Sequence, residues 1–197
     1  MSTHPSHPIR LIVGLGNPGS DYAPTRHNAG FWFVDLLADK YGVTFRADSK
    51  FHGQVAKITV AGKECWLLKP STFMNRSGQS VSSLAKYYKI NLGEVLVAHD
   101  ELDMAPGVAR IKFGGGHAGH NGLRDIISAM GGKDFWRLRV GIDHPGSAAK
   151  VVNYVLGRPS KQDEQAIMGI LDESGRVMPE LVSGEFQKAM NRLHAAS

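Results

Sequence analysis

The sequence of 197 residues has few features that would direct it to a membrane or to an oxidising compartment. No apolar run approaches the roughly 20 residues that a membrane-spanning helix needs. Residues 1–8 lack the apolar segment of a signal peptide. Cys65 is the only cysteine, so an intrachain disulfide is impossible, and its apolar neighbours indicate a buried strand. We therefore expect a cytoplasmic protein that makes no membrane contact.

Two familiar kinds of catalytic signature are also missing. No serine stands in a G-x-S-x-G turn, and no helix carries H-E-x-x-H. His117 and His120 have the spacing of metal ligands, but a flexible glycine-rich loop is a poor frame for fixed coordination. We therefore expect no metal, and a water molecule activated by a histidine is more economical than an acyl-enzyme.

The charge of the chain is unevenly distributed. The formal net charge is +5, and residues 108–140 hold six basic residues against the two acidic residues Asp125 and Asp134. On charge alone, a site for a polyanionic partner and an ordinary solvated basic face stay equally open. The six basic residues are Arg110, Lys112, Arg124, Lys133, Arg137 and Arg139.

Apolar runs and helical spacing alternate along the chain, which predicts an α/β fold. We expect a single domain with a central twisted mixed β-sheet flanked by helices. Residues 1–8 are expected to be a disordered extension, and residues 9–197 form the domain. Strands are predicted over residues 9–13, 51–60, 64–69, 95–99, 108–113 and 137–142, and helices over 30–41, 77–89, 123–130 and parts of the tail after Pro159, where Pro179 and Gly184 break the pattern.

The first loop, Gly14–Gly19, matches the dinucleotide fingerprint G-x-G-x-x-G. In a nucleotide-binding turn the helix starts at once, so that its N-terminus can hold a pyrophosphate. Here Pro18, Pro24 and a polar stretch delay the helix by about ten residues. A nicotinamide oxidoreductase is therefore disfavoured.

Polar side chains lie in this first loop, up to the start of the helix that follows it, and in three further loops. Asn28 and Asn75 each precede a predicted helix, where capping is the simplest role. His27 also lies near a helix N-terminus, which disfavours the imidazolium and helps to keep a neutral base. The carboxylates of residues 100–103 follow a strand and could orient a histidine from another loop. The glycine-rich stretch 114–125 can approach a polar substrate closely.

Taken together, these segments resemble bacterial peptidyl-tRNA hydrolases over nearly the whole chain. The resemblance implies a monomeric α/β enzyme that hydrolyses the ester joining a peptide to the 3′ end of tRNA. It implies no metal and no organic cofactor, and it makes residues 9–197 a single catalytic domain whose partner is peptidyl-tRNA. The matching segments are Gly14–Gly19, Thr25–Gly30, Thr72–Gly78, His99–Asp103, Gly114–Asp125 and Arg137–Ile142.

The resemblance also assigns roles by position. His27 is expected to be the base that activates water, Asp100 the carboxylate that orients it, and Asn17 a further catalytic side chain. Lys112 and Arg139 correspond to a pair that binds the 5′ phosphate of the tRNA. The residues expected to bind the peptide and the 3′ end are Tyr22, Met74, Asn75, His120 and Asn121. A non-catalytic RNA-binding protein on the same fold is the alternative, although it would not need His27 and Asp100.

Overall fold

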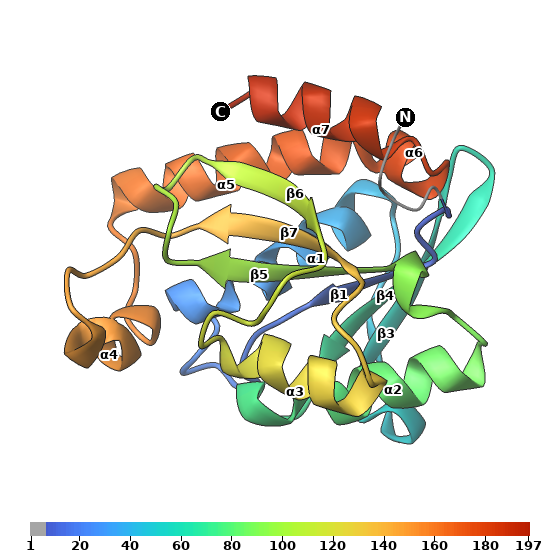
Figure 1. Cartoon of the computed structure of the whole chain (residues 1–197), viewed down its shortest axis with the longest axis horizontal. Helices are drawn as coiled ribbons and strands as arrows, with labels where there is room; N and C mark the ends of the chain where they lie inside the picture. The colour runs from blue at the N-terminus through green and yellow to red at the C-terminus, as the bar shows by residue number, and fades with distance from the viewer. Residues whose placement is uncertain (1–6) are drawn as a thin grey trace.

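A computed structural model describes residues 7–197, and all its strands belong to one seven-stranded sheet (Figure 1). The strand order is β2-β3-β4-β1-β5-β7-β6. The neighbours β4, β1, β5 and β7 run parallel, whereas β2, β3 and β6 pair antiparallel, so the predicted mixed sheet is confirmed. The strands are β1 Leu11–Gly14, β2 Arg46–Asp48, β3 Gly53–Val60, β4 Lys63–Pro70, β5 Val95–Glu101, β6 Ala109–Phe113 and β7 Trp136–Gly141.

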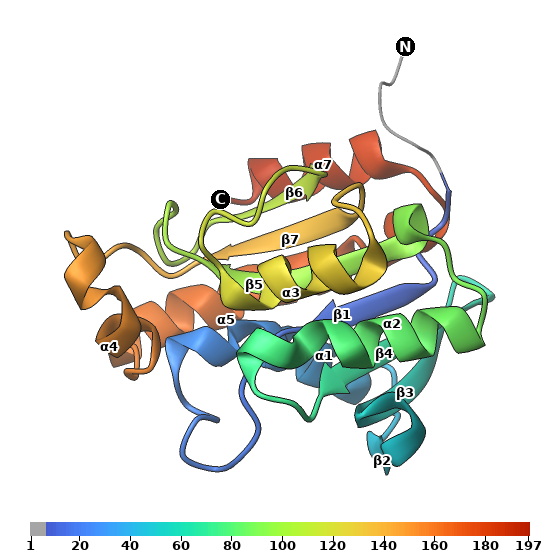
Figure 2. The ribbon, with the colours of Figure 1, turned by 60° about the horizontal axis from the view of Figure 1, so that its bottom comes forward.

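Helices cover both faces of the sheet, and each layer has its own apolar core. Helices α2 and α3 pack side by side on one face (Figure 2), where Val81, Leu84 and Ile126 are buried. On the other face Phe33 of α1 and Ile170 of α5 belong to a larger core. The helices are α1 Ala29–Lys40, α2 Ser77–Tyr87, α3 Asn121–Met130, α4 Val151–Val155, α5 Lys161–Arg176, α6 Met178–Val182 and α7 Phe186–Ala195.

The long predicted elements are confirmed to within a few residues, and the differences are local. Two short elements, β2 and α4, were not predicted, because three and five residues carry too little periodicity. The tail is broken at the two places predicted: α5 ends at Arg176, so that Pro179 lies in the first turn of a new helix, and Gly184, with φ of 76°, lies between α6 and α7. The disorder expected for residues 1–8 falls mostly outside the described residues.

The first glycine loop allows a helix and a strand to approach closely. A Cβ atom on Gly14 of β1 would lie 2.3 Å from the carbonyl oxygen of Gly30 in α1. A Cβ atom on Gly30 would lie 2.4 Å from the carbonyl oxygen of Ala98 in β5. Only hydrogen fits at either position. This close packing places the short 3₁₀ helix Arg26–Asn28, which precedes α1, beside the carboxyl end of β5.

Among residues 7–197, no helix is both long enough and apolar enough to cross a lipid bilayer.

Candidate active site

A cleft of about 720 Å³ opens at the carboxyl ends of the parallel strands. Tyr22, the one predicted site residue that does not line the cleft, contacts the cleft residue Phe73 instead, with ring centroids 6.4 Å apart. Nine of the ten predicted site residues do line it: Asn17, His27, Met74, Asn75, Asp100, Lys112, His120, Asn121 and Arg139.

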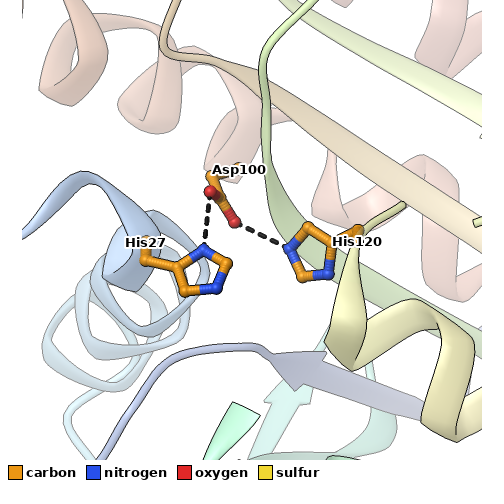
Figure 3. A group of neighbouring side chains, drawn as sticks. All are labelled: His27, Asp100 and His120. Carbon is orange, nitrogen blue, oxygen red and sulfur yellow. Dashed lines mark hydrogen bonds and ion pairs between the residues drawn. The ribbon is translucent and has the colours of Figure 1, made fainter. Parts of the chain in front are cut away.

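The side chain of Asp100, which lines the cleft, lies between two histidines (Figure 3). Its Oδ2 is 2.8 Å from Nδ1 of His27, and its Oδ1 is 2.8 Å from Nε2 of His120. The carboxylate is buried, so neither oxygen is well hydrated. Burial by itself raises the pKa of Asp100, but the two histidines outweigh it and hold that pKa well below its usual range. Asp100 is therefore an anion at neutral pH.

The protonation of His120 follows from its second nitrogen. His120 is the N-cap of α3, and its Nδ1 accepts hydrogen bonds from the backbone N–H groups of Gly122 and Leu123. An accepting Nδ1 must carry the lone pair, so the proton of the neutral ring is on Nε2, which donates to Asp100. Because both nitrogens are engaged within the protein, the substrate contact predicted for His120 could involve only its ring face.

His27 is held in the complementary tautomer. Its Nδ1 donates to a carboxylate that can only accept, so in the neutral ring Nε2 carries the lone pair. Burial lowers the pKa of His27, but the charge of Asp100 and the hydrogen bond to it raise the pKa further, and the net shift is upward. The expected lowering by a helix N-terminus is therefore not what governs this residue.

The side chain of Asn28 fixes the backbone of the loop that carries Asn17. The Asn28 side chain accepts from the Asn17 backbone N–H and donates to its carbonyl oxygen, both at 2.9 Å. The expected capping role is wrong, since the Asn28 side chain caps no helix although it precedes α1. The Asn17 side chain then accepts from the Met74 N–H at 2.7 Å through Oδ1. Its amide NH₂ group consequently remains as the donor end.

Asn75 also does not act as the predicted cap. It lies in the 3₁₀ helix Met74–Arg76, one residue too early to be the N-cap of α2, and it is exposed at the cleft. A backbone N–H at the N-terminus of α2 is bonded by a side chain of α3 instead: the Asp125 carboxylate accepts from the Gly78 N–H at 2.7 Å. The side chain of Asn75 is thus not used for capping.

His27, Asp100 and His120 also supply three donor atoms that could hold a metal ion, all within 4.8 Å of one another. The two histidine nitrogens that face Asp100 are, however, the ones that share their protons with it at 2.8 Å. Coordination through these two nitrogens would require both protons to leave and both rings to shift toward zinc–nitrogen distances of about 2.0–2.1 Å. The hydrogen-bonded arrangement accounts for the three side chains without a metal.

Comparison with known proteins connects this geometry to one family. A family model described as peptidyl-tRNA hydrolase matches residues 11–197. The chain belongs to the peptidyl-tRNA hydrolase family. A peptidyl-tRNA hydrolase from Stenotrophomonas maltophilia (strain K279a) is 58% identical over 94% of this chain and 97% of its own. A second from Chromohalobacter salexigens is 55% identical, covering 95% and 97%. The crystal structure of peptidyl-tRNA hydrolase from Acinetobacter baumannii, 52% identical, has a TM-score of 0.93 and covers 99% and 98%.

In this member of the peptidyl-tRNA hydrolase family, basic side chains of β6 and β7, the last two strands at one edge of the sheet, also line the cleft. Lys112 of β6 and Arg139 of β7 line it, as expected, together with Arg137, which the sequence placed only within the basic stretch. The Arg137 guanidinium is buried and donates to the carbonyl oxygens of Gly115 and Gly116. Burial, and then the charge of Arg139, lowers the pKa of Arg137 to about 10, so it remains a cation that fixes the glycine loop.

The neighbouring His99 has a different environment from His27 and His120. It is fully buried, and its Nδ1 donates to the backbone carbonyl oxygen of Asp100 at 2.8 Å. Burial, followed by the charges of His120 and Arg137, lowers the pKa of His99 to about 3. His99 is therefore neutral, and its ring packs edge-on against His120 with centroids 5.2 Å apart.

We expect His99 to make the folded state sensitive to acid. Below pH 6.5 the unfolded chain binds a proton at His99 while the folded chain does not, so stability is lost as the pH falls from 6.5 toward about 3. The loss amounts to about 1.4 kcal/mol per pH unit, or about 2 kcal/mol at pH 5. The measurement is urea unfolding of the wild type and His99→Leu at pH 7.5 and pH 5.

The comparison between the two proteins isolates His99, because the other titrating groups are common to both. His27, whose pKa is raised in the folded state, favours folding as the pH falls and so opposes the effect equally in each. The leucine variant should lose less stability between the two pH values. Equal losses would show that His99 binds its proton as readily in the folded chain as in the unfolded chain.

Proposed function

We propose that this chain hydrolyses the ester bond of peptidyl-tRNA by a water molecule that His27 activates. The observation that carries this proposal is the Asp100 carboxylate held between His27 and His120, because it leaves Nε2 of His27 as a base inside the cleft. In this arrangement His120 is a positioning residue, and Asp100 fixes the tautomer of the base and balances the charge that the base acquires.

The reaction balances with these groups alone. His27 takes a proton from water as the water oxygen attacks the ester carbonyl carbon, which gives a tetrahedral oxyanion. The bond to the ribose 3′ oxygen then breaks, and the imidazolium returns the proton to that oxygen. The products are the free peptide carboxylate, after loss of its own proton, and tRNA with a free 3′ end. A general base typically contributes about 10²- to 10⁴-fold to such a step.

Amide side chains in the cleft can stabilise the oxyanion. The Asn17 side chain is oriented by its hydrogen bond to the Met74 N–H, so its NH₂ group is pre-organised as a donor. Asn75 and Asn121 line the same cleft and complete the set from which the peptide and the ester are bound. One donor directed at an oxyanion is worth roughly 10²- to 10³-fold in comparable sites.

Lys112 and Arg139 supply the charges that would hold a tRNA phosphate. Both line the cleft, on the strands β6 and β7, where Arg137 adds a further positive charge. Contacts to phosphate carry no information on nucleotide sequence. The enzyme should therefore accept tRNAs of many sequences, as recycling of peptidyl-tRNA released from ribosomes requires.

A paired substrate test separates this proposal from an RNA-binding protein without activity. We expect rapid release of tRNA from N-acetylaminoacyl-tRNA and little release from the same tRNA with a free α-amine. The site accepts a neutral amide, whereas an ammonium group would lose hydration without gaining a partner. The acyl group is labelled, and hydrolysis is measured as the loss of acid-precipitable label, with the enzyme in catalytic amount.

Three outcomes of this test are distinct. Binding of both tRNAs without release of either would favour the non-catalytic alternative. Equal release from both would show that the cleft does not discriminate at the α-nitrogen. Release from the blocked substrate alone supports the proposed reaction and specificity.

A further inference from the structure

Glu101 is the acidic partner of Arg139 in the cleft. Its Oε1 lies 2.8 Å from Nε of Arg139, and both side chains line the cleft. Both are largely buried, with 13% of the Glu101 side chain and 26% of the Arg139 side chain exposed. The pair is therefore partly shielded from water, unlike a fully exposed surface ion pair, which typically contributes little.

Strand register explains why these two side chains meet. In the parallel pair of β5 and β7, His99 is opposite Arg139 and Glu101 is opposite Gly141. Side chains two residues apart on a strand share a face, so Glu101 lies diagonally ahead of Arg139 on the same side of the sheet. Gly141 opposite Glu101 has no side chain to compete with the arginine. The Glu101 carboxylate is also tethered by the Asp103 N–H, which donates to Oε2 at 3.3 Å.

The atom used in this contact determines what Arg139 can still do. Arg139 donates to Glu101 through Nε, at the inner end of the guanidinium group. Within residues 7–197, neither Nη group of Arg139 donates a hydrogen bond to the protein. The outer edge of the guanidinium, with two parallel N–H groups, is the edge that matches two oxygens of a phosphate.

We propose that Glu101 is a positioning residue that presents the Nη edge of Arg139 to a phosphate group of the RNA substrate. This rests on the proposed function, in which Arg139 and Lys112 hold the 5′ phosphate. Lys112 is a flexible point charge and needs no such orientation, whereas a planar guanidinium binds bidentately only when its plane is set. The Glu101 carboxylate lowers the net positive charge of the phosphate site, but it also fixes the orientation of the Arg139 guanidinium plane.

A purely electrostatic role for Glu101 makes a different prediction from a positioning role. If Glu101 only neutralised Arg139, its removal would strengthen phosphate binding whatever replaced it. If it positions Arg139, the replacement matters. Glutamine keeps an oxygen that can accept from Nε, whereas alanine leaves the guanidinium free to rotate. The pair Glu101→Gln and Glu101→Ala therefore separates the two roles.

The experiment measures KM and kcat on N-acetylaminoacyl-tRNA with and without its 5′ phosphate. We expect the wild type to have a lower KM for the phosphorylated substrate. Glu101→Ala should raise that KM about tenfold, the size of one charge-assisted hydrogen bond, with kcat and the KM for dephosphorylated substrate little changed. Glu101→Gln should keep the preference for the phosphorylated substrate.

Each other outcome has a definite meaning. A wild type that does not distinguish the two substrates would overturn the phosphate role of Arg139 and Lys112, but not the hydrolytic reaction. A wild type that distinguishes them, with both variants doing so equally well or better, would overturn the positioning role of Glu101 alone. Glu173→Ala, which removes a glutamate paired with Arg176 on α5, controls for the loss of one negative charge.

A double variant completes the test. If Glu101 acts through Arg139, Glu101→Ala should have no further effect on the phosphate preference in an Arg139→Ala background. An undiminished effect there would assign Glu101 a role independent of Arg139 and would also overturn the proposal. Melting temperatures of all variants establish that the fold is retained.

Discussion

His27→Ala is expected to lower kcat on N-acetylaminoacyl-tRNA by about 10²- to 10⁴-fold, the contribution of a general base. Because Nδ1 of His27 is bonded to Asp100, Nε2 of His27 carries the lone pair that is available in the cleft. His120, the other histidine bonded to Asp100, cannot replace it, because its Nδ1 is occupied by the N–H groups at the start of α3. The measurement is single-turnover hydrolysis, which reports the chemical step.

A second histidine provides the matched control. His52 lies outside the cleft and has a left-handed backbone with φ of 50°, which asparagine tolerates well. His52→Asn should therefore retain wild-type turnover. Near-native turnover by a folded His27→Ala protein would show that another group activates the water and would overturn the proposed mechanism.

Sequence patterns sufficed for the parts of the fold in which one stretch of chain determines its own structure. The apolar run 95–99 and the helical spacing of residues 77–89 predicted β5 and α2, since long regular elements carry their periodicity along the chain. The predicted delay before α1 is confirmed, since the helix begins only at Ala29. What the first glycines actually do, the close packing of α1 on β1 and β5, depends on atoms distant in sequence.

The residues that line the cleft were largely predictable from the sequence, but their hydrogen bonds were not. The resemblance assigned ten residues to the site by their position in the sequence, and nine of them line the cleft. Two interactions could not be predicted, because each requires the relative placement of separate loops. They are the pair of hydrogen bonds from the Asn28 side chain to the Asn17 backbone and the capping of α3 by His120. Glu101 gave only the weak signal of an acidic residue at a strand end, and its partner is 38 residues away.

Asp100→Asn is expected to lower kcat by about 10²- to 10⁴-fold and also to change its pH dependence. An asparagine has one accepting oxygen where Asp100 has two, and two N–H donors now face the same side chain from His27 and His120. The cap on α3 keeps His120 a donor, so His120 takes the oxygen. The amide NH₂ group then faces His27 and favours the tautomer with the proton on Nε2, which removes the base.

The pH profile separates this effect from a general loss of structure. Asp100 raises the pKa of His27 against the effect of burial, so its neutralisation leaves burial to lower that pKa. In the wild type kcat should fall as the pH drops through the raised pKa of His27. In Asp100→Asn the residual activity should persist to lower pH. Asp39→Asn, which removes an exposed carboxylate from α1, should leave both kcat and the profile unchanged.

The two readouts of Asp100→Asn are independent, because misfolding lowers activity at every pH and does not displace the acid limb. A lower kcat with an undisplaced limb would mean that the titrating group is not the histidine bonded to Asp100. A displaced limb with wild-type kcat would mean that the tautomer of His27 is set elsewhere. Only the combination of both changes follows from a carboxylate that serves two histidines at once, one held as a donor by a helix N-terminus and the other free to act as a base.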